Sequence, residues 1–325
     1  MTLFQSLRRN LIIVAAATLP ALAWANFPNQ PIRLVVPFPA GGSTDLVARV
    51  IAQELKDVLG QNVVVENRAG AGSLIGSEFV ANAPADGYTV LMAGLTNVFL
   101  PYAHANLRFH PVDAFTPVGL VADLPNVLAV NSKTPYRTLD DLIAADKAKP
   151  GSMTFGSAGL ATPSHLVCEM VNFQAKIKLE HIPYKGNAPA VNDLMAGHIP
   201  TMCNNLGGTL PYMNSGQIRI LAQTGKARSA SAPDVPTFSE LGIQGLDTGL
   251  WMGLMVPKAT PRDVVTTLNA ALTKVMNSTA TKSKLAALGA TTLNPNLAAF
   301  DERIQADRRS WDAVLKAVDL KASPR

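Results

Sequence analysis

The sequence predicts an α/β protein with two lobes, each built on a sheet that helices cover. Short apolar segments rich in β-branched residues alternate with amphipathic segments of helical period along the chain. Two extended apolar stretches, 117–130 and 249–256, interrupt this alternation. Two such crossings are what a lobe inserted into another lobe requires, so we expect one lobe from residues 26–125 and 252–325 and the other from residues 126–251. The alternative is that the two stretches are neighbouring strands of one larger sheet, which periodicity does not exclude.

Residues 1–25 have the features of a secretory signal peptide. Arg8 and Arg9 form a positive n-region, a short apolar region follows, and Ala23-Trp24-Ala25 places small residues where a signal peptidase cleaves. Pro20 interrupts the apolar run well short of the ~20 residues that a membrane span requires. We expect a mature periplasmic chain, exported by the general or the twin-arginine pathway.

The first block of the mature chain predicts a parallel sheet. Residues 32–36 form a short β-branched run, and residues 37–42, rich in proline and glycine, cannot continue a strand. Ser43 or Thr44 is expected to cap a helix that ends at Gly60. A strand, a helix and a strand follow at 63–65, 73–82 and 89–92. This order indicates parallel strands with helices on both faces.

The same alternation returns after the first long apolar stretch. Thr138-Leu139-Asp140-Asp141 matches a capping box that opens a helix. A strand at 153–155 leads to a second glycine-rich turn and to a helix from about Thr162. Further elements are expected at 179–182, 187–195 and 199–203. Thr260 and Pro261 predict another helix start, and a last helix is expected at about 297–320.

Composition excludes several classes of protein. Hydrophobic residues make up 48% and charged residues 16% of the chain, below the usual ~25% charged, which favours covered cores over disorder. The net charge of the chain is +5, and it decreases when the two leader arginines are removed with the signal peptide. The basic residues form no run or aromatic-basic pattern, so we expect no nucleic-acid partner. The five histidines lack metal-ligand spacing, and we expect neither a metal nor a cofactor.

The only two cysteines, Cys168 and Cys203, enter an oxidising compartment. They either form one disulfide or remain two buried thiols that pack as small hydrophobic side chains. The sequence does not separate these alternatives.

Two glycine-rich turns have the composition of an anion site. A carboxylate needs several convergent donors, which helix N-termini supply, and glycines allow a ligand to approach the backbone. Residues 40–44 combine these features at the carboxyl end of a strand, and residues 156–162 combine them in the second lobe. Thr96 and Asn97 follow a third strand and can add donors. Asp45 is expected to brace its helix and not to touch an anion.

The motifs in this order resemble the Bug family, the periplasmic receptors of tripartite tricarboxylate transporters. The resemblance covers essentially the whole mature chain. Its first signature is PIRLVVPFPAGGSTD at 31–45, and later ones are VENRAGAG at 65–72, DGYT at 86–89, PYKG at 183–186, PTFSELG at 236–242 and WMGL at 251–254.

This resemblance implies a type II periplasmic binding protein, with two α/β lobes, two crossover strands and the ligand between them. It implies capture of a small organic carboxylate, held largely by backbone N–H groups, hydroxyls and water, without catalysis. The expected ligand-binding residues are Phe38, Ala40, Gly41, Gly42, Ser43, Thr44, Thr96, Asn97, Ser157, Ala158, Gly159, Thr162, Tyr184 and Asn204.

The chain departs from the family pattern at two places. Leu160-Ala161-Thr162-Pro163 stands where a glycine and a serine are common, and Pro200-Thr201 stands where an acidic residue often follows. If that acid recognises a ligand amine, its absence favours plain or aromatic acids over amino acids. The identity of the acid and its stereochemistry stay open.

Three other functions are weighed against capture for a transporter. A monomeric receptor of this kind can instead report its ligand to the ectodomain of a membrane sensor, and nothing in the sequence separates the two outputs. The segment GAGSLIG at 70–76 imitates a dinucleotide fingerprint, but no acidic residue ends a following strand about 20 positions on. A serine hydrolase is disfavoured because the chain has no GxSxG motif.

Overall fold

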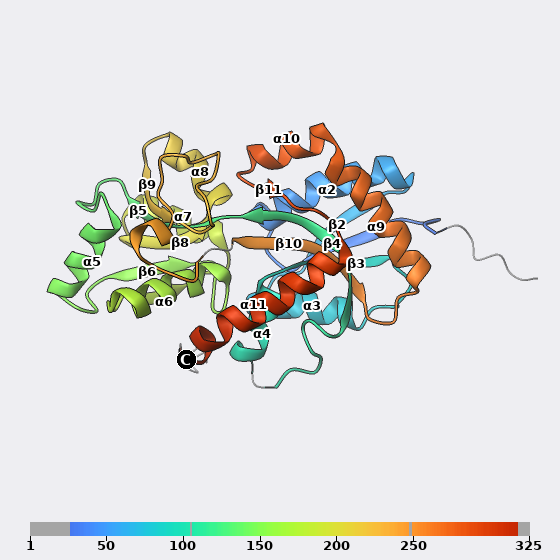
Figure 1. Ribbon diagram of the computed structural model, residues 1–325, viewed down its shortest axis with the longest axis horizontal. Helices are drawn as coiled ribbons and strands as arrows, with labels where there is room; N and C mark the ends of the chain where they lie inside the picture. Colours follow the sequence, from blue (N-terminus) through green and yellow to red (C-terminus); the bar gives the residue numbers. More distant parts are fainter. Residues whose placement is uncertain (1–26, 105, 247–248, 318–325) are drawn as a thin grey trace, which may run out of the picture.

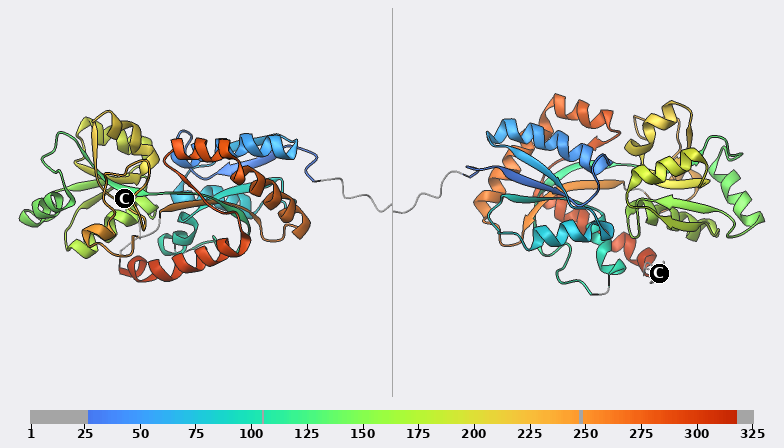
Figure 2. Two further views of the ribbon diagram at one scale, coloured as in Figure 1. Left: turned by 45° about the horizontal axis from the view of Figure 1, so that its top comes forward. Right: turned by 180° about the vertical axis from the view of Figure 1, so that it is seen from behind.

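The computed structural model describes residues 27–104, 106–246 and 249–317, and shows two α/β lobes side by side (Figure 1). The expected signal peptide lies outside these residues. The views in Figure 2 show the same two bodies joined by extended segments, with α11 (Leu297–Ala317) lying along the first lobe. No helix in the described part of the chain is long and apolar enough to cross a membrane.

The first lobe is built on a six-stranded mixed sheet of order β11-β4-β10-β3-β1-β2. The parallel pairs β1–β2 and β1–β3 are the sheet that the first block predicts. Strand β10 runs antiparallel to both β3 and β4. The strands are β1 (Ile32–Val36), β2 (Val63–Asn67), β3 (Thr89–Gly94), β4 (Phe115–Leu124), β10 (Leu250–Pro257) and β11 (Thr291–Thr292).

The second lobe is built on a five-stranded sheet of order β7-β6-β8-β5-β9. Strand β6 pairs in parallel with β7 and β8, while β5 runs antiparallel to β8 and β9. The strands are β5 (Asn126–Asn131), β6 (Thr154–Ser157), β7 (Glu180–Pro183), β8 (Thr201–Asn205) and β9 (Ile218–Gln223).

Two connections join the lobes, as the two long apolar stretches indicate. Strands β4 and β5 are separated only by Pro125, so one nearly continuous stretch leaves the first sheet and enters the second. The chain returns through β10, whose eight residues are all buried. The lobe boundary expected between residues 251 and 252 therefore falls within β10.

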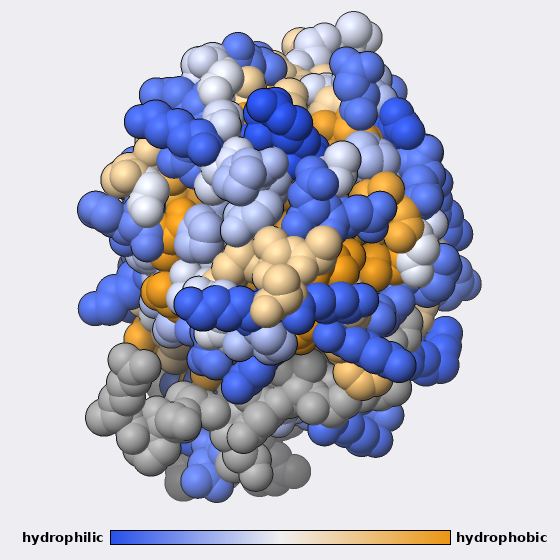
Figure 3. Space-filling model, turned by 90° about the vertical axis from the view of Figure 1, so that its left-hand side faces the viewer, coloured by the Kyte–Doolittle hydropathy of each residue, from blue (hydrophilic) through white to orange (hydrophobic). Residues whose placement is uncertain are grey.

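Helices cover both sheets and bury one face each. In the first lobe they are α2 (Ser43–Leu59), α3 (Leu74–Ala81), α4 (Thr96–Ala103), α9 (Arg262–Asn277), α10 (Thr279–Ala287) and α11, and a 3-10 turn η1 (Ala71–Ser73) precedes α3. In the second lobe they are α5 (Leu139–Ala148), α6 (Pro163–Ala175), α7 (Asn187–Ala196) and α8 (Leu206–Asn214), followed by the 3-10 turn η2 (Ser239–Leu241). Figure 3 shows the far end of the second lobe as mainly hydrophilic, with small groups of apolar side chains between the polar ones.

Two predicted helix caps are wrong by one or two positions. Gly42, not Ser43 or Thr44, is the N-cap of α2, and no side chain caps it. Pro261 is the N-cap of α9, because the Thr260 hydroxyl donates to the Pro257 carbonyl instead of accepting from the helix. The capping box at Thr138 and Asp141 is confirmed, with both reciprocal hydrogen bonds formed.

Cys168 on α6 and Cys203 on β8 form a disulfide. The bridge closes a sequence separation of 35 residues within the second lobe, and both sulfur-bearing residues are fully buried. Of the two alternatives that the sequence leaves open, the structure has the disulfide.

Candidate ligand-binding site

A cavity lies between the lobes, at the carboxyl ends of the central strands of both sheets. Five helices begin at its wall: α2 and α4 from the first lobe, and α6, α7 and α8 from the second. Their first residues or N-caps that line it are Gly42, Thr96, Thr162, Gly186 and Asn205. Helix N-termini expose unpaired N–H groups and the positive end of the helix dipole, so this cavity favours an anion.

The first-lobe wall is held in place by Asp45. Its carboxylate accepts hydrogen bonds from the Gly41 N–H at 2.8 Å, the Arg49 Nε at 2.9 Å and the Asn67 Nδ2 at 2.9 Å. Burial opposes ionisation of Asp45, but the hydrogen bonds from Arg49, Gly41 and Asn67 together outweigh it and lower its pKa. Asp45 thus braces the turn as a carboxylate that points away from the cavity, as the sequence predicts.

The second-lobe wall is held by its own hydroxyl groups. The Thr162 hydroxyl donates to the Gly159 carbonyl at 2.7 Å and accepts from the His165 N–H at 3.4 Å, as an N-cap does. The Ser164 Oγ accepts from the Ala158 N–H at 3.1 Å and lies 3.0 Å from the Thr162 hydroxyl. These contacts fix the conformation of the loop before α6.

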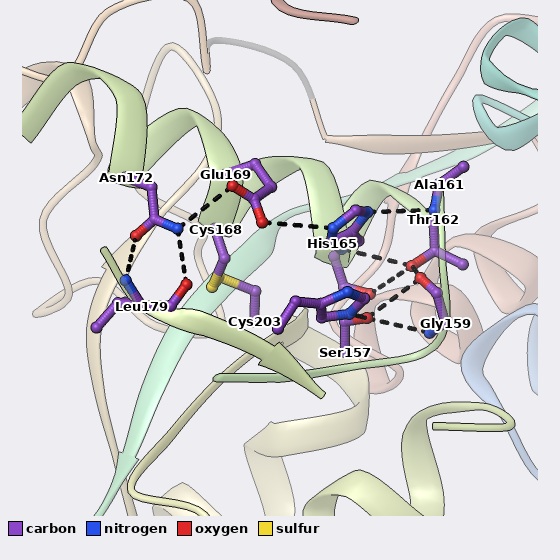
Figure 4. A network of polar contacts seen from close by, with 12 residues as sticks. Ser157, Gly159, Ala161, Thr162, His165, Cys168, Glu169, Asn172, Leu179 and Cys203 are labelled. Carbon is purple, nitrogen blue, oxygen red and sulfur yellow. Dashed lines mark hydrogen bonds and ion pairs between the residues drawn. A yellow bond between two sulfur atoms is a disulfide. The ribbon is translucent and has the colours of Figure 1, made fainter. Parts of the chain in front are cut away.

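Beside this loop, the His165 imidazole supports the wall (Figure 4), and the His181 imidazole stacks on it. The rings of His165 and His181 lie 3.9 Å apart, and His181 Nε2 is 2.7 Å from the Ser157 Oγ. Burial, followed by repulsion from His165, lowers the pKa of His181 to about 3, so this imidazole is neutral at neutral pH. Ser157, which also accepts from the Gly159 N–H at 3.1 Å, is a positioning residue of the loop.

One hydrogen bond crosses the cavity from lobe to lobe. Ser43, in the first turn of α2, donates its Oγ hydrogen to the Oδ1 of Asn205. The same Oδ1 accepts from the Gly208 N–H at 2.9 Å and so caps α8. The lobes are therefore already in contact at the cavity.

The charge on the described lining of the cavity is positive. Of the described residues that line it, only Lys185 is charged, and no aspartate or glutamate is among them. Lys185 has no ion-pair partner within the described residues. The Thr96 Oγ1 is buried and has no hydrogen-bond partner among the described residues, so it is available to a ligand. No group of three or more His, Cys, Asp or Glu side chains in the described chain is placed to hold a metal ion.

The structure brings most of the predicted site residues together. The predicted residues that line this cavity are Phe38, Ala40, Gly42, Ser43, Thr44, Thr96, Ala158 and Thr162. Gly159 and Tyr184 line an adjoining cavity, and the Tyr184 hydroxyl is used by Asp193 at 2.7 Å.

Four predicted residues do not reach the cavity. Gly41 binds Asp45, and Ser157 is turned towards His181. Asn97 points into the first lobe, where its amide binds the Gly94 N–H and the Ser77 Oγ. Asn204 is fully buried and its Oδ1 accepts from the Asn205 N–H.

Part of the second-lobe wall consists of residues that the sequence did not predict. The residues concerned are Asn126, Ser164, Lys185, Gly186, Asn187, Ala188, Pro189 and Asn205. The N-terminus of α7 follows the PYKG segment directly, so glycine before a helix was a usable signal there. Asn126 carried no local signal, because it lines the cavity only through its place after the crossing at Pro125.

The chain is similar to known proteins over nearly its full length. A sequence model described as the tripartite tricarboxylate transporter family receptor matches residues 47–320. Protein BugT of Bordetella pertussis is 37% identical over 319 residues, which cover 95% of this chain and 96% of BugT. The UPF0065 protein in the tcbD-tcbE intergenic region of Pseudomonas sp. strain P51 is 35% identical over 298 residues, 91% of this chain and 89% of that protein.

Solved structures share both lobes. Periplasmic binding protein BugD has a TM-score of 0.85 and 34% identity, with 91% of this chain and 100% of that one covered. An R. palustris protein solved with adipate has a TM-score of 0.86 and 32% identity, covering 90% and 98%. MatC from Rhodopseudomonas palustris, solved with malate, has a TM-score of 0.82 and 30% identity, covering 89% and 100%. The fold is thus the two-lobed α/β fold of periplasmic binding proteins.

Proposed function

Because this chain belongs to the tripartite tricarboxylate transporter receptor family, we propose that it captures a small organic carboxylate in the periplasm for a transporter of that type. The observation that carries this proposal is the meeting of five helix N-termini at one cavity whose described lining contains no acidic side chain. Such a cavity stabilises a carboxylate and offers no counter-ion to an amine. The relatives solved with adipate and with malate support an acid without an amine.

The proposed mechanism is closure of two rigid lobes about the connecting segments. The carboxylate binds the turn before α2 and the turn before α6, and its contacts to both lobes exist only in the closed state. We propose that the chain acts as a monomer after removal of residues 1–25 and that closure is what membrane subunits recognise. It carries out no reaction on its ligand.

The proposal is tested by calorimetry on the exported chain, residues 26–325, after unfolding and refolding have removed any ligand carried through purification. The panel contains mono-, di-, tri- and aromatic carboxylates with their amides as matched controls. Tight binding of at least one acid, lost on amidation, is expected. Equal binding of an acid and its amide, or no binding by any acid, would overturn the assignment to carboxylates.

A further inference from the structure

His165, in the first turn of α6, contacts the second-lobe wall of the cavity through its imidazole (Figure 4). Its side chain is 3% exposed, and its Nδ1 accepts a hydrogen bond from the Ala161 N–H at 3.2 Å. A ring nitrogen that accepts a hydrogen bond carries no hydrogen, so the other ring nitrogen, Nε2, carries it. Nε2 lies 3.5 Å from the Glu169 Oε1. The contact with Ala161 therefore requires a neutral His165.

Ala161 adopts a backbone conformation that needs support. Its φ of 56° is in the left-handed region, which a residue with a Cβ adopts at an energetic cost. Ala161 is 1% exposed, so its N–H depends on the His165 Nδ1 for a hydrogen-bond partner. The neutral imidazole thus stabilises a turn that the backbone of alanine does not favour.

The loop that contains Ala161 forms part of the cavity wall. Ala158 and Thr162, on either side of Ala161, both line the cavity between the lobes. A Cβ added to Gly72 would lie 3.0 Å from the Leu160 carbonyl oxygen, so the same loop also meets the first lobe. A change in the conformation of Ala161 would therefore move atoms at the ligand site and at the contact between the lobes.

Two titratable side chains face the His165 imidazole. Glu169, one turn further along α6, lies beside Nε2, and His181 on β7 stacks on the ring with the ring centroids 3.9 Å apart. Phe155 on β6 stacks on both imidazoles and is uncharged. The strands β5, β6 and β8, which also pack against α6, contain no charged residue.

Of the two stacked imidazoles, His165 is the one that can gain a proton under mildly acidic conditions. Burial, followed by repulsion from His165, lowers the pKa of His181 to about 3, so His181 is still neutral where a histidine ordinarily becomes charged. The Glu169 carboxylate lies on the side of His165 and favours a positive charge there. A second charge on the stacked pair is opposed by the short distance between the rings.

Protonation of His165 places a hydrogen on Nδ1, directly opposite the Ala161 N–H. Two donors cannot bond to each other, so this hydrogen bond is lost. We propose that His165 is a positioning residue that makes ligand capture depend on pH. The neutral imidazole holds the loop at residues 159–162 in its binding conformation, and protonation releases the loop. Because the ligand then binds the neutral form preferentially, its affinity decreases as the pH falls.

This inference rests on the proposed function and adds to it the regulation of the same site. The test measures the affinity for adipate by calorimetry at about pH 7.5 and about pH 5.5, on either side of the ordinary titration of histidine. His165→Leu removes the acceptor, whereas His165→Asn keeps an acceptor oxygen near the position of Nδ1 that does not titrate. The ionisation of adipate itself changes over this range, but it changes equally for every protein compared.

We expect the affinity of the wild type to decrease at the lower pH by at least about fivefold more than that of His165→Asn, as for the loss of one hydrogen bond. His165→Leu should bind weakly at both pH values, and His165→Asn should recover most of the affinity that His165→Leu loses. His110→Asn is the matched control. The His110 Nδ1 also accepts from a backbone N–H, that of Asp113 at 3.1 Å, but His110 lies outside the cavity lining, so this variant should keep the wild-type pH profile.

A second measurement needs no ligand. Hydrogen exchange at residues 158–162 of the ligand-free exported chain, corrected for the intrinsic effect of pH, should show less protection at the lower pH in the wild type and no change in His165→Asn. The inference is wrong if the wild type and His165→Asn share one pH dependence of affinity, or if the protection of this loop does not respond to pH. Failure of the wild type to bind adipate or any acid of the carboxylate panel would instead contradict the proposed function, and the exchange measurement would still decide whether His165 controls the loop.

Discussion

The polar side chains at the cleft differ in how much of their hydrogen-bonding capacity the protein itself uses. Thr162 and Ser164 are occupied by their own loop, and Ser43 is occupied by Asn205 across the cleft. Thr96 is buried at the same cavity, and its hydroxyl has no hydrogen-bond partner among the described residues. We therefore expect a ligand carboxylate to gain most from Thr96 and from backbone N–H groups, and we expect Ser43 to exchange its bond to Asn205 for one to the ligand.

Replacement of Gly42 should affect ligand binding much more than folding. Its φ of −76° suits any residue, and the nearest atom to an added Cβ is the Pro39 carbonyl oxygen at 3.5 Å. We expect Gly42→Ala to bind with reduced affinity and Gly42→Val to bind at least about a hundredfold more weakly, because the added methyl groups fill the cavity. Calorimetry measures binding, and thermal unfolding should show a stability loss of no more than about 1 kcal/mol for an N-cap change. Unchanged affinity of Gly42→Val would remove the turn before α2 from the site.

His181 makes the stability of the second lobe depend on pH. Because its folded pKa of about 3 is below the ordinary value of 6.5, the unfolded chain binds more protons between these values. The contribution of the neutral imidazole is complete above about pH 6.5 and decreases as the pH falls towards 3. We expect the free energy of unfolding to fall by about 2–3 kcal/mol between roughly pH 7 and pH 4.5 because of this group.

The measurement is urea unfolding as a function of pH for the wild type, His181→Gln and a second histidine variant, His198→Gln. The His198 side chain is 71% exposed, and its Nδ1 lies 3.2 Å from the Asp193 Oδ1 at the surface. His181→Gln should reduce the slope more than His198→Gln does. The same slope in all three proteins would show that His181 does not titrate as its burial predicts.

At the scale of elements, the N-termini of helices form most of the cavity wall. The apolar periodicity places α2, α6 and α7 after turns rich in glycine, proline or both, but it does not say that these starts share one cavity. They meet because the parallel strands β1 and β6 end at the same cleft, each followed by a helix. Open α/β sheets bind ligands at the carboxyl ends of their strands for this reason.

The disulfide links helix α6, whose N-terminus lies at the cavity, to the sheet of the second lobe. Cys168 on α6 is bonded to Cys203 on β8 across a separation of 35 residues. Loss of this link in a Cys168→Ala/Cys203→Ala variant should cost about 3–4 kcal/mol of unfolding free energy through the entropy of the unfolded chain. We expect the Tm of the second lobe to fall by roughly 10 °C in scanning calorimetry.

The wild type treated with reductant is the matched control for the disulfide. Its Tm should fall to that of the double variant, and the variant should not respond to reductant. An equal Tm in the oxidised wild type and the variant would mean that the bond adds no stability to the lobe.

On the scale of the whole molecule, the lobes also touch away from the ligand. Gly207, at the start of α8, faces the Leu288 carbonyl at the end of α10, and an added Cβ would lie only 2.2 Å from that oxygen. On the other side of the contact, Gly289 lies close to the Gly207 backbone. Glycine at this point lets the two backbones approach each other at this contact between the lobes.

Gly207→Ala should therefore impair closure without altering a residue that lines the cavity. We expect Gly207→Ala to have a larger radius of gyration than the wild type in small-angle scattering. We also expect its affinity for the ligand to be about tenfold lower or more, because a smaller fraction of the protein can close. Gly42→Ala provides the comparison, since it should weaken binding without changing the radius of gyration of the ligand-free protein. Wild-type affinity and scattering in Gly207→Ala would show that this contact does not limit closure.

The sequence by itself determined most of the elements, the family and the glycine-rich turns at which helices begin, and it favoured two crossings without excluding neighbouring strands of one sheet. Strands β4 and β10 are both, since they lead to and from the second lobe and pair antiparallel within the first sheet. The elements, the family and the turns are local properties: periodicity, turn residues and motif order depend on neighbours in the chain. The sequence could not show that Asn97 and Ser157 point away from the ligand, since each has an alternative partner, Ser77 and His181, about 20 residues away. Only the tertiary structure decided that Asn126 and Asn205 line the cavity, that the cysteines are bonded and that the Thr96 hydroxyl finds no partner among the described residues. Each of these depends on which distant residues the packing of two lobes brings together.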